Sequence, residues 1–389
     1  MAKDTDAAGS GVAPVAAADA TGVPAPDDAV RDEKPAAPPE TAKRGGRSSH
    51  VLARYLAIRA VLIIPTVWIL VTVVFFFLRV IGDPITAAQG GRLPPDKINE
   101  LKQAAGYNDP IIVQYGRYLW DMLHGNFGTT LTDHRPISQV IVQYGPATLE
   151  LVFWALIVAF LVGIPLGRLA ARHYNRGPDM GIRLFAILFY AAPVFFLAIV
   201  LKLIFAIWLK WLPVSGRASI MVQTALESKD RVNTHVYIIN AIMSGNGSYV
   251  VDVLRHAVLP GLALGLMTAG VFIRLIRINL LQTLRADFVT AARARGVSES
   301  KVVAQHAFRN ALIPVVTVMG MEIAMMLGGA ILTETSFEWK GLGYALSQAL
   351  IARDFVAVQG MVTGIAVIVA VASFLIDIIN ALVDPRVRY

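Results

Sequence analysis

The chain has 389 residues, of which 56% are hydrophobic and 16% are charged, and its formal net charge is +8. A soluble domain is typically about 45–50% apolar and about 25% charged, so this composition indicates an integral membrane protein. The basic residues lie beside apolar segments without any nucleic-acid-binding motif, so we expect no nucleic-acid partner. The absence of cysteine excludes disulfides, thiolate catalysis and cysteine-ligated metals.

Residues 1–50 are rich in Ala, Pro and Asp and contain almost no large apolar side chain. They cannot bury enough surface to offset the entropy of folding, so a disordered extension is predicted. No apolar core follows a basic start, so the extension is not a signal peptide. The basic residues before the first apolar segment place this end in the cytoplasm; they are Lys43, Arg44, Arg47, Arg54 and Arg59.

Residues 51–389 are predicted to form an all-α membrane domain with six transmembrane helices. The apolar segments, each near the ~20 residues that cross a bilayer, lie at about 57–80, 147–170, 184–209, 257–273, 311–332 and 357–382. The loops after the second and fourth segments are strongly basic, and the tail carries Arg386 and Arg388. Both termini and the loop at 284–310 are therefore expected in the cytoplasm of a multi-pass protein.

The loop at 82–145 is expected outside the cytoplasm and is long enough to contain structure. Pro95 favours the start of a helix that Gly106 ends, and a second helix is predicted from about Ile111 to His124. This loop is either a solvent-exposed cap or a docking surface for an external partner. The polar loop at 213–255 carries no motif.

Residues 286–314, between the fourth and fifth segments, are predicted to form two short helices. Asp287 can cap the first, Gly296 suits a left-handed stop, and Ser298 can cap the second. This region is basic, with Arg293, Arg295, Lys301 and Arg309. A basic helical elbow on the cytoplasmic face is expected to be bound by a cytoplasmic partner.

Three charged residues fall inside the apolar segments. Glu322 lies mid-membrane, where a carboxylate costs about 2.5–3.5 kcal/mol, so it should face a cavity or a partner. Either it lines a translocation path, together with Met321 and Met325, or it forms an interhelical hydrogen bond. Lys202 is expected to extend toward the nearby membrane surface, and Asp377 to pair with cations.

The motif Ala291-Ala292-x-x-x-Gly296 resembles the EAA loop of permease subunits of ABC importers. Surrounding segments resemble the dipeptide/oligopeptide branch, in its B-type permease; they include PATLEL at 146–151, WLPVSGR at 211–217, HAVLP at 256–260 and DFVTAARARG at 287–296. Two positions depart from the pattern. Thr290 stands where the general motif has glutamate, and Lys340 replaces the usual proline of a WPGLG turn.

The resemblance implies a type I ABC importer permease fold, in a bacterial cell membrane, with a cytoplasmic coupling helix. It implies four kinds of partner: a homologous second permease, ATPase subunits that use ATP and Mg, an extracytoplasmic substrate-binding protein, and a peptide substrate. The expected ATPase-coupling residues are Ala291, Ala292, Arg293, Arg295, Gly296 and Arg309. The expected outer gate or docking residues are Asn126, Phe127, Glu334, Trp339, Gly341 and Gly343.

The chain has no P-loop, no HExxH and no GxSxG motif, so we expect no enzymatic activity, no bound cofactor and no metal site. Two alternatives remain for the function. The same permease type could carry nickel or glutathione, because the binding protein largely selects the cargo. A proton-coupled secondary transporter would need a relay of buried carboxylates or histidines, and Glu322 is a single candidate.

Overall fold

The computed structural model describes residues 47–89, 93–228 and 233–383. This part of the chain is helical throughout, and its only paired extended backbone is an isolated bridge between Thr129 and Pro136. The all-α prediction is confirmed. Residues 1–46 of the expected extension, and the tail cations Arg386 and Arg388, lie outside the described residues.

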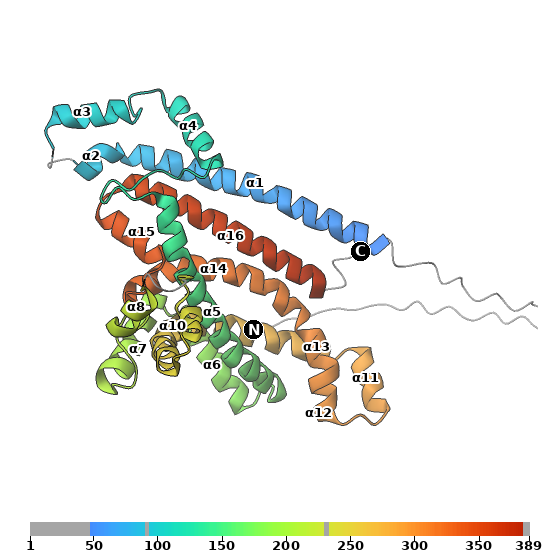
Figure 1. Cartoon of the computed structure of the whole chain (residues 1–389). Helices are drawn as coiled ribbons and strands as arrows, with labels where there is room; N and C mark the ends of the chain where they lie inside the picture. The colour runs from blue at the N-terminus through green and yellow to red at the C-terminus, as the bar shows by residue number, and fades with distance from the viewer. Residues whose placement is uncertain (1–46, 90–92, 229–232, 384–389) are drawn as a thin grey trace, which may run out of the picture. The chain divides into compact units, whose positions relative to one another are not determined.

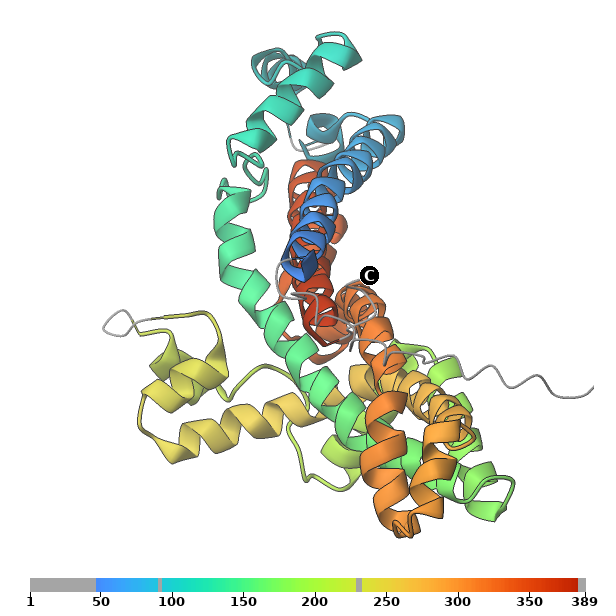
Figure 2. The same ribbon diagram turned by 90° about the vertical axis from the view of Figure 1, so that its right-hand side faces the viewer.

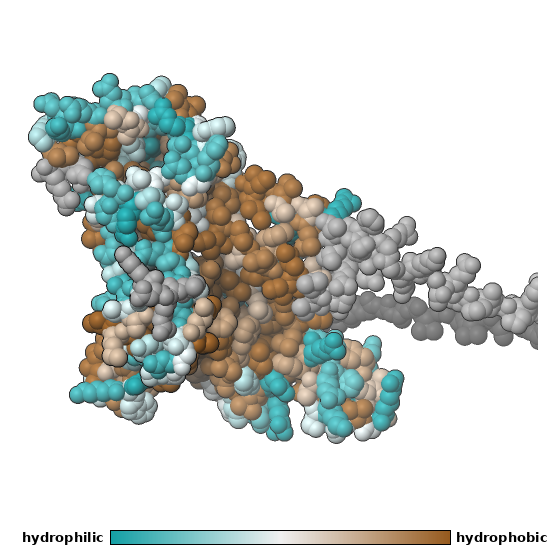
Figure 3. Space-filling model, viewed as in Figure 1, coloured by the Kyte–Doolittle hydropathy of each residue, from teal (hydrophilic) through white to brown (hydrophobic). Residues whose placement is uncertain are grey.

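Five helices are long and apolar enough to cross a membrane. They are α1 (Arg47–Ile81), α5 (Ile137–Arg172), α10 (Gly247–Thr283), α14 (Ile313–Phe337) and α16 (Phe355–Val383). Figure 1 shows α1 beside α16, and these two helices are in contact along their length. In Figure 3 hydrophobic side chains gather over both, while hydrophilic ones cover much of α3 (Pro95–Ala104) and the elbow.

The third predicted span is broken, which corrects the prediction of one helix over 184–209. Helix α6 (Gly177–Ala191) and the pair α7 (Val194–Leu201) and π-helical η1 (Lys202–Trp208) are bent by 107°. Ala192, at the break, is extended with ψ of 132° because it precedes Pro193, whose ring disfavours a helical conformation in the preceding residue. The membrane domain thus has five spans, or six if this bent pair counts as one.

Helices α5 and α10 form the centre of the domain and pack through small residues. Figure 2 shows the course of the long α5. A Cβ on Gly265 would lie 2.5 Å from the carbonyl oxygen of Ala155, and one on Gly163 would lie 2.8 Å from Cβ of Phe272. Glycine at both positions therefore lets the two helix backbones approach closely. The adjoining core brings in α14 through Met326.

Lys202 reaches the C-terminal end of α14. Its Nζ donates a hydrogen bond to the carbonyl oxygen of Ser336 at 2.8 Å and lies 5.6 Å from the ring centre of Phe337. It thereby satisfies a carbonyl at the C-terminal end of α14, where a cation is also favoured by the helix dipole. Asp377 pairs with Arg59 at 3.4 Å, and that prediction is confirmed.

The connecting segments contain the shorter helices. Between α1 and α5 the chain forms α2 (Pro84–Gln89), α3 and α4 (Ile111–Leu123), and both helices predicted for this loop are confirmed. The segment before α10 contains α8 (Ile220–Leu226) and α9 (Tyr237–Met243), which the sequence did not indicate. The elbow contains α11 (Asp287–Ala294), α12 (Glu299–Lys301), η2 (Val302–Ala307) and α13 (Phe308–Ala311), and α15 (Leu342–Ile351) precedes α16.

Candidate functional site

The elbow, residues 286–314, forms two antiparallel arms joined at Gly296. This glycine has φ of +77° and occupies the left-handed conformation that ends α11, as predicted. The structure differs from the prediction at the N-terminal caps of both helices. Ala286 is the residue before α11, so Asp287 is the first helical residue, and Ser298 precedes α12 without a hydrogen bond from its side chain to the backbone.

The two elbow alanines face opposite ways. Ala292 is buried in an apolar cluster that joins the arms to the ends of α5 and α10; its other buried members are Ala171, Leu280, Val289, Val302, Ala307 and Ala311. Ala291 is exposed and lies on one face of α11 with the exposed Phe288 and Arg295. The exposed surface of α11 therefore contains Ala291, whereas Ala292 packs inside the elbow.

The elbow arginines also differ in their roles. Arg293 donates to both carboxylate oxygens of Glu299, from Nη2 at 2.7 Å and from Nε at 3.0 Å, and so ties one arm to the other. The Arg293 guanidinium lowers the pKa of Glu299, and the carboxylate raises the pKa of Arg293 in return. Within the described residues, neither Arg295 nor Arg309 forms an ion pair, and both are exposed.

One contact holds the base of the elbow to α5, and a second contact joins α10 to α6. The guanidinium of Arg168, near the end of α5, lies 4.6 Å from the ring centre of Phe308 in α13. Arg277 of α10 donates hydrogen bonds of 2.6 and 2.8 Å to the fully buried Asp179 of α6. A bidentate pair of this kind fixes both helices in one orientation.

The expected path residues separate onto two faces of α14. Met321 and Met325, one turn apart, are exposed in this single chain. Glu322 is only 8% exposed and points inward, and among the described residues its carboxylate has no hydrogen-bond or ion-pair partner. The structure thus keeps Glu322 away from lipid, and it gives the interhelical hydrogen bond no donor within this chain.

Four of the expected gate residues form a buried turn between α14 and α15. Glu334 is fully buried and accepts a hydrogen bond from the Tyr344 backbone N–H at 2.9 Å. A Cβ on Gly341 would collide with the carboxylate of Glu334. A Cβ on Gly343 would lie 2.5 Å from Cα of Ile331. Close backbone approach therefore requires both glycines, and Lys340 leaves the turn intact.

Trp339 is also fully buried, and its Nε1 donates to the carbonyl oxygen of Ala147 at 2.8 Å. Next to it, the Leu342 backbone N–H donates to Thr148 Oγ at 2.8 Å. These bonds attach the turn to α5. Glu334 and Trp339 thus lie inside the protein and not on its surface, and their role at an outer gate stays a prediction.

The other two expected gate residues begin a hairpin at residues 125–136. Asn126 is exposed and accepts a hydrogen bond from the Gly128 N–H at 3.0 Å, whereas Phe127 is half-buried against α16. The buried Asp354 holds the hairpin by accepting from the backbone N–H groups of Leu131 and Thr132 at 2.6 and 3.2 Å. The turn is therefore fixed to the start of α16.

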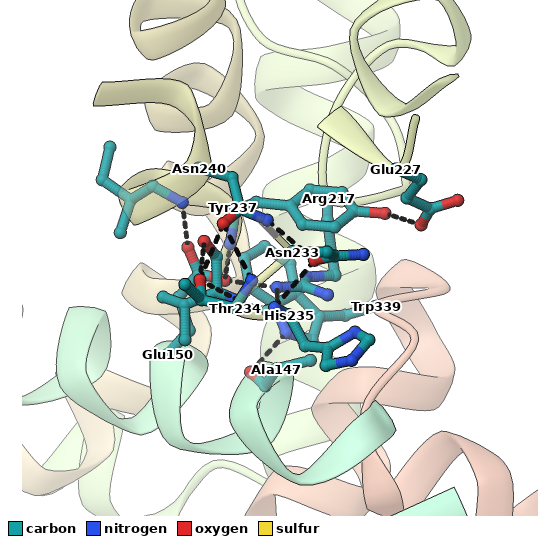
Figure 4. Close-up of polar contacts among 12 residues, drawn as sticks. Ala147, Glu150, Arg217, Glu227, Asn233, Thr234, His235, Tyr237, Asn240 and Trp339 are labelled. Carbon is teal, nitrogen blue, oxygen red and sulfur yellow. Dashed lines mark hydrogen bonds and ion pairs between the residues drawn. The ribbon is translucent and has the colours of Figure 1, made fainter. Parts of the chain in front are cut away.

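A buried polar network that the sequence did not indicate lies at the same part of α5, as Figure 4 shows. Glu150 of α5 pairs with Arg217 at 2.5 Å and accepts from the backbone N–H groups of Tyr237 and Ile238 at 3.2 and 3.0 Å. Arg217 also donates to the His235 carbonyl oxygen at 2.9 Å. Glu150 and Arg217 lie in the PATLEL and WLPVSGR segments, but neither segment indicates that the two residues pair.

Tyr237 completes this network. Its ring centre lies 3.8 Å from the Arg217 guanidinium, and its hydroxyl donates to Glu227. Burial, together with this hydrogen bond, raises the pKa of Tyr237, so the hydroxyl remains a neutral donor. A cavity of about 320 Å³ opens beside the network and is lined in part by Glu227, His235 and Lys340.

The arrangement, a helical elbow between two spans and a fixed polar structure at the opposite end of the same helices, suits a membrane component that is moved by a partner. The family model described as the inner membrane component of binding-protein-dependent transport systems matches residues 163–389. The model for the N-terminal part of such membrane components matches residues 51–152. The chain belongs to this family.

Curated relatives agree along nearly their whole length. The dipeptide transport system permease protein DppB of Alkalihalophilus pseudofirmus is 34% identical over 86% of this chain and 99% of its own. DppB of Escherichia coli K12 is 35% identical over 87% and 99%. The glutathione transport system permease protein GsiC of Salmonella paratyphi A is 33% identical over 87% and 100%.

The resemblance to dipeptide and oligopeptide ABC permeases is confirmed. The chain is a multi-pass permease subunit with the type I permease fold, and such subunits are non-catalytic membrane components. Among the residues that the structure describes, no group of three or more His, Asp or Glu side chains could hold a metal ion.

Proposed function

We propose that this permease imports dipeptides or short oligopeptides in an ATP-driven complex. Relatives named as dipeptide permeases, aligned over 99% of their length, carry this proposal. Both termini and the elbow would lie in the cytoplasm, as the basic loops favour. A homologous second permease would complete the translocation path, and a substrate-binding protein would deliver peptide from outside.

The elbow is the proposed contact with the ATPase, which would bind and hydrolyse ATP with Mg. The exposed face of α11, with Phe288, Ala291 and Arg295, supports this role because it is slim, apolar at its centre and positive at one end. Arg309 would add charge from the second arm. Ala292, Arg293 and Gly296 would act by holding that face in shape, since their contacts are within the elbow.

On α14, we assign Glu322 to the path and Met321 and Met325 to a surface that meets the second permease or lipid. A carboxylate without a partner in its own chain suits transient contact with a peptide ammonium group. The turn that holds Glu334, Trp339, Gly341 and Gly343 would keep the outer end of the path in register with α5. Asn126 and Phe127 would present the neighbouring hairpin to the binding protein.

The deciding experiment is affinity purification of the tagged full chain from its native membrane, followed by mass spectrometry. We expect a second permease, an ATPase and a binding protein, and we expect Gly296→Asp to lose the ATPase while the second permease is retained. Peptide eluted from the binding protein would establish a peptide cargo. Elution of glutathione or nickel would establish that cargo instead. A chain that purifies alone and transports peptides under a proton gradient without ATP would overturn the proposal.

A further inference from the structure

Helix α4, in the loop between the first two spans, lies beside the membrane-spanning helices and not beyond their ends (Figure 1). Its Tyr115 hydroxyl is hydrogen-bonded to Thr72 of α1 at 2.6 Å, and its Tyr118 hydroxyl to Thr363 of α16 at 2.6 Å. Phe75 of α1 stacks against both tyrosine rings, with centroid distances of 5.3 and 5.6 Å. One face of α4 is thereby fixed to both spans.

The positions of these partners give the depth of α4. Thr72 lies nine residues before the end of α1 at Ile81, or about 13 Å along the helix. Thr363 lies eight residues after the start of α16 at Phe355, or about 12 Å. The apolar segments of 26 and 25 residues exceed a hydrocarbon core of about 30 Å by about 4 Å at each end, for helices along the membrane normal. Both tyrosine hydroxyls therefore lie about 8–9 Å inside the hydrocarbon core.

The opposite face of α4 is apolar and uncovered. Ile112, Trp120 and Leu123 are 68%, 64% and 75% exposed, and they form one strip with Gly116. The exposed side of α1 adjoins this helix, because Val73, Phe77 and Val80 face outward beside the residues of α1 that contact α4. Exposure of such an apolar surface to water would be unfavourable.

The polar groups of α4 suit a membrane interface. Arg117, one of its two charged residues, is paired with Asp109 at 2.8 Å, back toward the loop that precedes the helix. The His124 ring lies 4.5 Å from that of Trp120, so a polar ring borders the apolar strip. Aromatic side chains with a polar edge are enriched at the membrane–water interface, and interfacial helices insert their apolar face to about 5–10 Å below it.

We propose that α4 is embedded in the membrane leaflet on the side of the 82–145 loop, with Ile112, Gly116, Trp120 and Leu123 in contact with lipid acyl chains. Lipid is the occupant because the helix adjoins a surface of α1 that already faces lipid and lies at the same depth. The segment is then neither a solvent-exposed cap nor, through this face, a docking surface for a soluble protein. The proposal does not depend on the transported cargo.

Gly116 gives a direct test, because a Cβ there would have no atom within 4 Å and the chain has no native cysteine. We would label Gly116→Cys with a polarity-sensitive fluorophore in the full importer, reconstituted in lipid nanodiscs. Phe77→Cys on α1 is the matched lipid reference, and Lys97→Cys on the exposed side of α3 is the water reference. Quenching is measured with lipids carrying a nitroxide near the headgroup and with aqueous iodide.

The Gly116 label should be quenched by nitroxide lipid at least threefold more than the Lys97 label and should match Phe77, with little quenching by iodide. A Gly116 label that behaves like Lys97 would overturn the proposal. A label that neither quencher reaches lies against protein, and that result would overturn it as well.

A second comparison tests the energetics without relying on the label at Gly116. With the fluorophore at Leu123→Cys, adding Gly116→Lys should lower nitroxide quenching at least twofold, because the charge is expelled from the hydrocarbon region. Gly116→Leu, at the same open position, should leave the quenching unchanged. Equal quenching in the two variants would contradict a lipid contact.

Discussion

Arg217 donates a hydrogen bond to Glu150 over 2.5 Å, and the contact joins the segment before α8 to the middle of α5. The same carboxylate accepts from the backbone N–H groups of Tyr237 and Ile238, so it also holds the start of α9. Both members of the pair are buried. One ion pair therefore anchors both the residues before α8 and the start of α9 to α5.

Removal of the arginine should be costly because it leaves an uncompensated charge inside the protein. We expect Arg217→Met to lower the free energy of unfolding by about 3–5 kcal/mol, measured by thermal unfolding in detergent. Arg255→Met is the matched control, since Arg255 is exposed and only donates to the Trp211 carbonyl oxygen. The double variant Glu150→Gln with Arg217→Met should regain part of the loss, and a double variant no more stable than the single one would contradict this explanation.

The Arg293–Glu299 contact predicts a charge-reversal result in the elbow. Arg293→Glu places two carboxylates together and should reduce ATP-dependent uptake several-fold by opening the arms. Adding Glu299→Arg should restore uptake, because the pair is rebuilt with its charges exchanged. Arg295→Glu should not be rescued by Glu299→Arg, since Arg295 has no ion pair within the described residues. Equal rescue of both variants would show that only net charge matters.

The same pair sets a pH window. The hydrogen bond from Arg293 lowers the pKa of Glu299 below its usual value of 4.5 in the folded chain. Its contribution to stability is therefore fully present above pH 4.5 and is lost as the pH falls through the lowered value. The difference in melting temperature between wild type and Glu299→Gln should stay constant from pH 7 to about pH 5 and shrink below that. A difference that grows on acidification would contradict the pairing.

The junction between α14 and α15 should not accommodate even one added methyl group at Gly343. Gly343→Ala would place a Cβ 2.5 Å from Cα of Ile331 and 3.0 Å from Oε2 of Glu334, so backbone must shift. We expect a loss of about 1–3 kcal/mol in the free energy of unfolding. Gly328→Ala in α14, with no atom within 4 Å of the new Cβ, is the control and should be neutral or stabilising through helix propensity. Equal effects of the two changes would argue against close approach at the turn.

Glu322→Gln tests the path without a change in size. Because the carboxylate has no partner in its own chain, we expect the melting temperature to be unchanged or raised, while uptake of peptides with a free amino terminus falls at least threefold. N-acetylated peptides, which lack the ammonium group, provide the control and should be transported equally by both proteins. Unchanged uptake of every peptide would remove Glu322 from the path.

Apolar length predicted the spans well, because a bilayer imposes one simple constraint on each helix. The third span was the exception, and Pro193 was the only sequence feature that indicated a break there. Proline alone could not have marked the break, since Pro146, Pro165 and Pro260 all lie inside continuous helices. Whether a proline breaks a transmembrane helix depends on how its neighbours satisfy the freed carbonyl groups, and a single sequence does not show this.

The elbow was predicted to the residue at Gly296, because a left-handed helix end has a local chemical signature. The sequence could not tell that Ala292 is buried and Ala291 exposed, or that Arg293 pairs while Arg295 does not. Those differences arise where the two arms and the ends of α5 and α10 pack together. The Glu150–Arg217 pair joins residues 67 positions apart, and no local pattern predicts such a contact.

Helix α5 connects both ends of the molecule without an intervening loop. Ala171 belongs to the apolar cluster of the elbow, and Glu150 anchors the polar network 21 residues earlier, about 32 Å along the same helix. A rotation of this rod by only about 5° at the elbow would displace the Glu150 end by about 3 Å, enough to break the hydrogen bonds of a buried carboxylate. A single helix therefore links the elbow to the Glu150 network, and a displacement of one end would reach the other without an intervening loop.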